Sequence, residues 1–341
     1  MVKSNYKAWH IRRDDFSDSW SEADKLRFFA RYAILAPSGH NTQPWKLTTH
    51  KNSLTVSINK SHFLSADGSG LLSVEPYISI GTFLEVFSLA ARGFGYAITV
   101  RLFSKEDQIA EISIKSKSAP EPHLLDAITA RVSNRNPFQE TPISQKSLGA
   151  ITANNLSGVA TTLVTGKHDM DFIAEQTENA VEAIMGNPHY RKELSKWVRI
   201  NPTRKHDGMP GFTHGFGHLQ SLVSRAAVRH LPKHGPQAKK SGALIRKSGA
   251  LVIVCCTDNK KESFVNAGRL YSQICVLAQD SGLATSALGA SVIHADTREE
   301  VKQYFKIKVR PIYILRLGQA TTAARHSPRW PLEKVLSRAA S

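Results

Sequence analysis

The chain has 341 residues, 41% of them hydrophobic and 21% charged, and its 45 Lys and Arg against 28 Asp and Glu give a formal net charge of +17. This length fits one or two domains with a substantial core. No apolar run approaches the ~20 residues that span a bilayer, and no apolar stretch follows the first basic residues, so we expect a cytoplasmic protein without a membrane partner. Because the basic residues are spread along the chain, we expect attraction of anionic cofactors and no nucleic acid.

Helix and strand patterns alternate through the first part of the chain. Ser21 can cap a helix in which Phe28, Phe29 and Tyr32 recur at helical spacing. Gly93 and Gly95 can take the left-handed conformation that ends a later helix. The predicted elements are a helix over 21–35, hairpin strands over 45–47 and 54–58, a buried helix over 80–91, and strands over 97–103 and 112–114.

The second part continues with the same two patterns. An apolar run holds Cys255 and Cys256, which we interpret as buried strand thiols and not as redox or metal groups. The predicted elements are helices over 124–130 and 144–151, a strand over 251–256, a helix over 267–278 that ends at Gly282, and a strand over 312–317.

Two of the predicted helices match each other. Both open on a glycine, and each has an alanine ten residues later, Ala91 after Gly81 and Ala278 after Gly268. Apolar positions between these residues also correspond. The match suggests two fused copies of one structural unit.

Residues 203–237 are predicted to be irregular, because His206 to Leu219 alone contains four glycines. A long loop in a compact domain is often a lid over a functional site. The spacing of His214 and His218 could bind a metal on a helix, but the glycines between them disfavour a helix. We therefore expect a lid and no metal.

A turn at residues 36–45, Ala-Pro-Ser-Gly-His-Asn-Thr-Gln-Pro-Trp, is the first candidate site. Pro37 breaks the preceding helix, and Ser38 and Asn41 then offer short hydrogen-bonding side chains. A simple helix-to-strand turn around a buried Trp45 is an equally open interpretation.

Basic residues form the second and third candidate motifs. In an extended segment, Arg131, Ser133 and Arg135 point to one face, and paired guanidinium groups suit an anion. Arg325 and Arg329 follow a predicted strand and could reach a phosphate. A solvated basic face and an unstructured basic tail are the respective alternatives.

These motifs together resemble the FMN-dependent nitroreductase family over most of residues 25–340. Ordinary members carry both the Arg-x-Ser-x-Arg signature and the Pro-Ser-x-x-Asn turn in one chain, and two chains form a dimer. Here the turn occurs only in the first half and the signature only in the second, which is similar to the fused, Acg-like branch. The resemblance implies an α+β fold with mixed or antiparallel sheet cores, two related halves at 1–120 and 121–341, an insertion at about 203–237, and one complete FMN site.

The same resemblance assigns roles to particular residues. Arg131 is expected at the FMN phosphate, Ser133 at the phosphate or ribityl chain, and Arg135 at the N1 and O2 edge of the flavin. No catalytic side chain is expected, because the flavin N5 carries the chemistry. The remaining expected cofactor contacts are Pro37, Ser38 and Asn41 at the ring, Arg325 and Arg329 at the phosphate, and Ser286 and Gly289 near N5.

The function implied by the resemblance is ping-pong hydride transfer from NADH or NADPH through FMN to a nitroaromatic or quinone-type acceptor. The alternative is a non-catalytic protein that sequesters FMN in an occluded pocket. A basic protein of nucleic-acid or membrane surfaces is a third reading. The partner is expected to be a small-molecule acceptor, and the chain a monomeric pseudo-dimer or a further homodimer.

Overall fold

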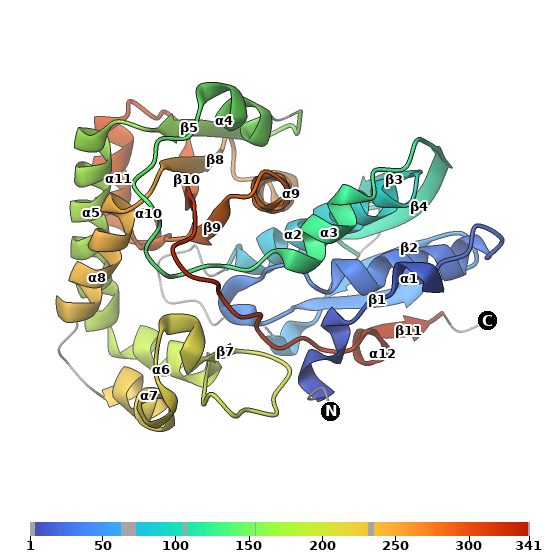
Figure 1. Ribbon diagram of the computed structural model, residues 1–341, viewed down its shortest axis with the longest axis horizontal. Coiled ribbons are helices and arrows are strands. Elements are labelled where there is room, and N and C mark those ends of the chain that lie inside the picture. Colours follow the sequence, from blue (N-terminus) through green and yellow to red (C-terminus); the bar gives the residue numbers. More distant parts are fainter. Residues whose placement is uncertain (1–3, 63–72, 105–107, 154, 231–234, 340–341) are drawn as a thin grey trace.

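The computed structural model describes residues 4–62, 73–104, 108–153, 155–230 and 235–339 (Figure 1). Positions 231–234 of the predicted insertion lie outside these ranges. Two separate β-sheets, each with its own helices, form the two halves of the molecule. This arrangement confirms the predicted α+β fold built from two related halves.

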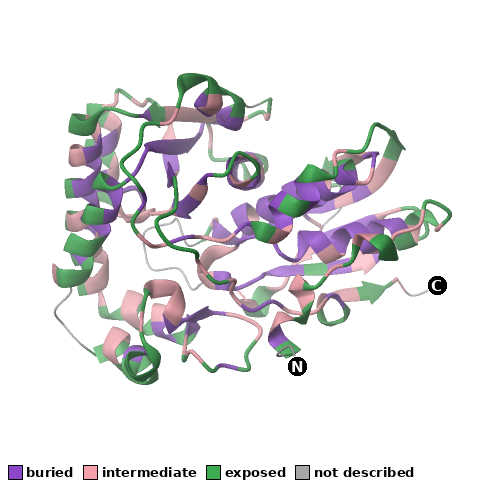
Figure 2. Cartoon of the chain, in the orientation of Figure 1, coloured by how far each residue is buried: buried purple, intermediate pink, exposed green. Residues whose placement is uncertain are grey.

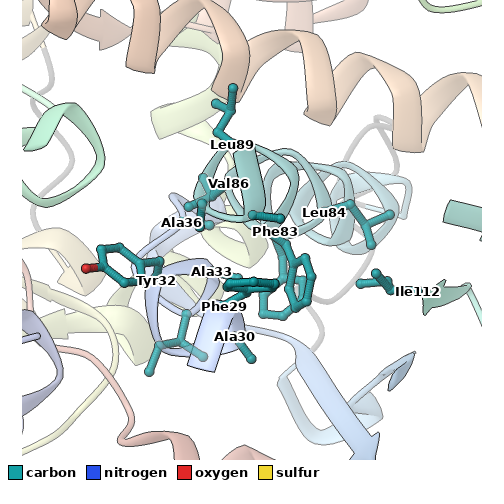
Figure 3. Packing of buried hydrophobic residues seen from close by; sticks show 14 of the residues in the cluster. Phe29, Ala30, Tyr32, Ala33, Ala36, Phe83, Leu84, Val86, Leu89 and Ile112 are labelled. Carbon is teal, nitrogen blue, oxygen red and sulfur yellow. The ribbon is translucent and has the colours of Figure 1, made fainter. Parts of the chain in front are cut away.

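The first half is a sheet covered by two long helices. Ser21 caps the first of them as predicted, since its Oγ accepts a hydrogen bond from the Asp24 N–H at 3.2 Å. Aromatic and aliphatic side chains fill the space between the helices (Figure 3). The elements are η1 (Ser4–Trp9), η2 (Arg13–Asp15), α1 (Glu22–Ala33), η3 (Gly39–Asn41), β1 (Trp45–Thr49), β2 (Leu54–Ile58), η4 (Lys60–His62), α2 (Glu75–Gly93), β3 (Tyr96–Leu102) and β4 (Ala110–Lys117).

The second half contains a four-stranded sheet with helices on both faces. Its central strand is buried along its whole length, and burial raises the pKa of Cys255 and of Cys256 to about 12. The elements are α3 (His123–Ala130), α4 (Gln145–Thr152), β5 (Val159–Val164), α5 (Lys167–Gly186), α8 (Gly235–Arg246), β8 (Ala250–Cys256), α9 (Lys261–Asp280), β9 (Ala284–Ala287), α10 (Ala290–Ile293), α11 (Ala295–Tyr304) and β10 (Arg310–Gly318).

The C-terminal end returns to the first half. A short helix, α12 (Leu332–Val335), leads into β11 (Leu336–Arg338), which pairs in parallel with β1. The first sheet therefore has the strand order β11-β1-β2-β4-β3, and the second has the order β5-β8-β10-β9. The predicted unit 121–341 thus gives its last strand to the sheet of the predicted unit 1–120.

Helices α2 and α9 join the halves at a close crossing. A Cβ atom on Gly81 would lie 1.9 Å from the Val265 carbonyl oxygen, and one on Gly268 would lie 1.9 Å from the Ile78 carbonyl oxygen. Each contacted carbonyl belongs to the residue three positions before the opposing glycine. The two predicted repeat helices therefore pack against each other through equivalent surfaces.

The ends of these helices correct part of the prediction. Gly95 and Gly282 have φ angles of +78° and +74°, and each follows the crossing glycine by fourteen residues. Gly93, however, is the last residue of α2 and does not take the left-handed conformation. Neither helix begins at its glycine, because α2 begins at Glu75 and α9 begins at Lys261. Each glycine lies instead inside its helix, at the crossing, where a side chain would collide with the other helix.

The insertion is more regular than the glycine content predicts. After η5 ends at His214, Gly215 turns the chain with φ +78°, and α7 begins at His218. The two histidines therefore do not share a helix. The predicted insertion contains β7 (Met209–Pro210), η5 (Gly211–His214) and α7 (His218–His230). It packs with α6 (Pro188–Trp197) and β6 (Val198–Arg199), which precede residue 203, and below the term insertion covers residues 188–230. Across the described ranges, no helix combines the length and apolarity needed to cross a bilayer.

Candidate functional site

Two adjoining cavities lie where the two halves meet the insertion. The smaller has a volume of about 50 Å³ and the larger about 310 Å³. Pro37, Ser38, Ser133, Arg135 and Met209 line both of them. The site is therefore elongated, with a narrow end and a wider end, and it takes walls from both halves.

The smaller cavity is strongly basic. Arg131, Arg135, Arg325 and Arg329 line it, and its described lining includes no Asp or Glu. Arg131 is 3% exposed, and its Nη2 donates to the Leu35 carbonyl at 3.1 Å. Charged groups without acidic partners in a buried place favour an anionic ligand with oxygen acceptors.

Among these four arginines, Arg329 is held by the most hydrogen bonds within the described part of the chain. Its Nη1 donates to Asn41 Oδ1 at 2.7 Å, and its Nη2 donates to the Leu35 and Ala36 carbonyls, each at 3.2 Å. Burial and the neighbouring charge of Arg131 lower the pKa of Arg329 to about 9. Its Nε is buried with no hydrogen-bond partner among the described residues. A bound anion would offset the cost of holding this cation out of water.

The turn after α1 has an unusual backbone. His40, Asn41 and Gln43 have φ angles of 48°, 58° and 52°, in the left-handed region that non-glycine residues seldom adopt. Hydrogen bonds hold the turn, including one from the Gln43 N–H to Ser38 Oγ at 3.0 Å and one from Asn41 Nδ2 to the Pro328 carbonyl at 3.0 Å. Backbone strain maintained in this way is common at functional sites.

The larger cavity has mainly apolar and aromatic walls. Its volume lies at the lower end of the range found for small-molecule sites. Gly289 leaves part of the wall free of a side chain, so that a ligand could approach the backbone there, whereas the Glu75 side chain fills the space beside Gly39. The bulky lining residues are Tyr190, Leu194, Met209, Tyr271, Ile293 and Tyr313.

Glu75 supplies the acidic group of the larger cavity. It is the first residue of α2, and it is 8% exposed. Its carboxylate accepts hydrogen bonds from the Tyr313 hydroxyl and, at 3.3 Å, from Ser79 Oγ. Burial outweighs these bonds and raises the pKa of Glu75 to about 7. Nearby, burial and the charge of Arg135 lower the pKa of His40 to about 4, so its imidazole is neutral at neutral pH.

The structure brings nearly all of the sequence-predicted residues together. Ser286 is the exception, because its side chain lies on β9 opposite Arg316 with a buried hydroxyl and lines neither cavity. The adjacent Ala287 lines the larger cavity instead. The predicted residues that line a cavity are Pro37, Ser38, Asn41, Arg131, Ser133, Arg135, Gly289, Arg325 and Arg329.

Several lining residues were not predicted from the sequence. Glu75, Tyr271 and Tyr313 come from α2, α9 and β10, whose sequences show mainly the apolar pattern of buried elements. An available signal was a carboxylate at the start of an otherwise apolar helix. His214 comes from residues 203–237, where the sequence predicts a lid but no individual contacts, whereas Tyr190 lies in α6, before the predicted lid.

The insertion is fastened to the first half at 203–208. Asn5 Nδ2 donates to the carbonyls of Thr203 and Lys205, both at 3.0 Å, and Gln43 Nε2 donates to the His206 carbonyl at 2.7 Å. The His206 ring also stacks on Trp330 with centroids 4.8 Å apart. These contacts hold the insertion against the first half, where its Met209 and His214 line the larger cavity. Among the described residues, no group of three His, Cys, Asp or Glu could hold a metal ion.

Comparison with known proteins gives the resemblance independent support. No family model matches the chain. It is 26% identical over 347 residues to "Putative NAD(P)H nitroreductase acg" of Mycobacterium tuberculosis, covering 93% of this chain and 97% of that protein. It is also 22% identical over 349 residues to "Probable NAD(P)H nitroreductase PigM" of Serratia, covering 94% and 95%. These full-length matches confirm the resemblance stated from the motifs.

Solved structures give weaker likenesses. A nitroreductase with bound FMN from Desulfitobacterium hafniense is 15% identical, with a TM-score of 0.42, and covers 63% of this chain and 97% of its own. The FMN and NADPH-dependent nitroreductase NfnB is 18% identical with the same TM-score of 0.42, and covers 63% and 97%.

Proposed function

We propose that this chain is an FMN-binding oxidoreductase that uses NADH or NADPH to reduce a small acceptor of the nitroaromatic or quinone type. The observation that carries the proposal is the shape and charge of the joined cavities. A narrow end rich in unpaired guanidinium groups adjoins a wider, aromatic end, which suits a planar ring on a phosphate-bearing chain. The full-length relatives named as NAD(P)H nitroreductases support the same reading.

The residues present fit this cofactor. Arg131 and Arg329 would hold its phosphate, because they are buried cations with hydrogen-bonding capacity and without acidic partners in the described part of the chain. Arg135 stands at the junction of the cavities, where its charge would favour negative charge on a neighbouring ring edge. When bound, FMN supplies the transfer of hydride from a nicotinamide to an acceptor.

The remaining walls would prepare the wider cavity for that chemistry. Tyr190 and Leu194 of the insertion cover it and limit access of water. Glu75 can keep a proton near neutral pH beside the Tyr313 hydroxyl. Donor and acceptor would use the same face of the ring in turn, which corresponds to a ping-pong order.

Anaerobic mixing of the FMN-loaded chain with NADH or NADPH tests the proposal. We expect the flavin absorbance to bleach promptly with at least one donor, and to recover when a quinone or nitroaromatic acceptor is added. Flavin that stays oxidised with both donors would contradict the proposed reductase. A chain that takes up no flavin would contradict the proposal at its first step.

Arg131→Ala should weaken FMN binding by on the order of 1.5–3 kcal/mol, because it removes charged hydrogen bonds to the phosphate. Fluorescence titration of free flavin measures the dissociation constant. Arg131→Lys should give an intermediate loss, since it keeps the charge without the planar fork. Arg101→Ala, at an exposed position on β3, is the control and should bind FMN like the original chain. Unchanged affinity in Arg131→Ala would remove Arg131 from the phosphate site.

The fastening of the insertion favours a second candidate, an FMN-binding protein whose pocket is closed to nicotinamides. Asn5→Ala and Gln43→Ala each remove hydrogen bonds that hold the cover. If the flavin of the original chain resists both donors and these variants become reducible, occlusion is the better description. Equal reduction rates in all three proteins would exclude the cover as a barrier.

A further inference from the structure

Helix α7 is largely exposed to solvent (Figure 2), and its exposed residues include an apolar stripe. Leu219, Leu222 and Val223 are 78%, 51% and 62% exposed, and they account for three of the six exposed large hydrophobic side chains in the described ranges. Exposed Ala226 continues the stripe at helical spacing. Exposed aliphatic side chains that lie next to one another indicate an interaction surface more often than single exposed ones do.

The opposite face of α7 explains why the stripe points outward. Ser221 and Ser224 are 0% and 4% exposed, and their hydroxyls donate to the carbonyls of His218 and Ser221 at 2.7 and 2.8 Å. Ser221 Oγ also accepts a hydrogen bond from the Asn201 N–H at 3.1 Å. The helix therefore docks through small hydroxyl residues and leaves its aliphatic residues in water. This is the reverse of an ordinary surface helix, which buries its apolar face.

The surroundings of the stripe are basic and contain no acidic residue in sequence. Between Asp207 and Asp258 there is no Asp or Glu, whereas there are seven Lys and Arg, of which Arg246 is paired with Asp171 and Glu178 of α5. Arg225 and Arg229 lie on exposed positions of α7 beside the stripe, and no ion pair joins either to an acidic group within the described part of the chain. The surface of α7 thus combines exposed aliphatic side chains with two arginine charges, Arg225 and Arg229, that no described acidic group neutralises.

We propose that α7 docks on the surface of an anionic phospholipid bilayer. The stripe of Leu219, Leu222 and Val223 would enter the boundary between headgroups and acyl chains, and Arg225 and Arg229 would meet lipid phosphates. This differs from the expectation of no membrane partner, and it returns for this one helix to the third reading, a basic protein of membrane surfaces. The inference rests on this surface alone and is independent of the proposed reductase activity.

Two other occupants fit the surface less well. A second copy of the chain would place two sets of unneutralised arginines against each other, and like charges in contact oppose association. A nucleic acid would satisfy the arginines but would leave the aliphatic stripe in water. A bilayer with anionic headgroups satisfies both features at once.

Cosedimentation with vesicles tests the docking. The full chain is mixed with vesicles of equal parts phosphatidylglycerol and phosphatidylcholine, or of phosphatidylcholine alone, at low and high salt. We expect binding to the anionic vesicles that weakens with salt and is at least about tenfold stronger than to phosphatidylcholine, since each basic residue near such a surface contributes about fivefold. The variant Leu219→Ser/Leu222→Ser/Val223→Ser should lose at least about tenfold in partition.

A matched control separates the stripe from general surface effects. Leu163→Ser changes an exposed leucine on β5, far from α7 in sequence, and should bind vesicles like the original chain. Circular dichroism checks that each variant is folded. Binding that survives the triple variant, or an original chain that stays in the supernatant, would overturn the proposal. The proposal would also be overturned if the chain does not bind vesicles but forms a dimer in equilibrium sedimentation, or binds an oligonucleotide tightly.

Discussion

Gly268→Ala is expected to destabilise the chain by about 3 kcal/mol or more, because the added methyl group would meet backbone and not a side chain that can move away. The new Cβ would lie 1.9 Å from the Ile78 carbonyl oxygen and 2.7 Å from its carbonyl carbon. To remove this overlap, α2 and α9 would have to separate, and the partly buried Arg269–Glu85 ion pair at 3.1 Å joins the same two helices. Denaturant unfolding followed by circular dichroism measures the loss.

Gly149→Ala is the matched control for this change. Gly149 is exposed in the middle of α4, and a Cβ there would meet nothing within 4 Å. Alanine should therefore stabilise the chain by about 0.5–1 kcal/mol through its better helix propensity. If the two related halves pack symmetrically, Gly81→Ala should resemble Gly268→Ala. A stability within about 0.5 kcal/mol of the original for both crossing variants would show that the helices are not in such close contact.

The repeated unit could be recognised from the sequence because a helix crossing this close accepts only glycine. The same requirement placed Gly81 and Gly268 at equivalent positions, and the turn geometry placed Gly95 and Gly282 fourteen residues later. The true helix starts could not be predicted in the same way. Glycine has low intrinsic helix propensity, so it suggests a boundary when the packing partner is unknown.

The charged end of the site was also predictable, whereas the wider end was not. Arg131, Ser133 and Arg135 lie in one short extended segment, so their common direction follows from local geometry. The walls formed by Glu75, Tyr271 and Tyr313 join three elements distant in sequence, and only the crossing of α2 and α9 brings them together. The helix α7 was missed because glycines on its N-terminal side outweighed its helical periodicity.

Glu75→Gln is expected to make the chain more stable at alkaline pH but not at acidic pH. Burial raises the pKa of Glu75 from 4.5 to about 7 in the folded chain. The folded chain therefore binds the proton more tightly than the unfolded chain, so the contribution of this group is fully favourable below about pH 4.5 and is lost as the pH rises through about 7. The difference corresponds to about 3 kcal/mol.

Unfolding free energies of the original chain and of Glu75→Gln, measured between about pH 5 and pH 8, isolate this effect because other titrating groups cancel in the difference. Glu140→Gln, at an exposed position, should leave the pH dependence unchanged. Tyr313→Phe removes a hydrogen bond that favours the charged carboxylate, so the pKa of Glu75 should rise further and the loss of stability should move to higher pH. Parallel curves for the original chain and Glu75→Gln would show that Glu75 is ionised across this range, and the cavity would then carry a fixed negative charge beside its arginine-rich end.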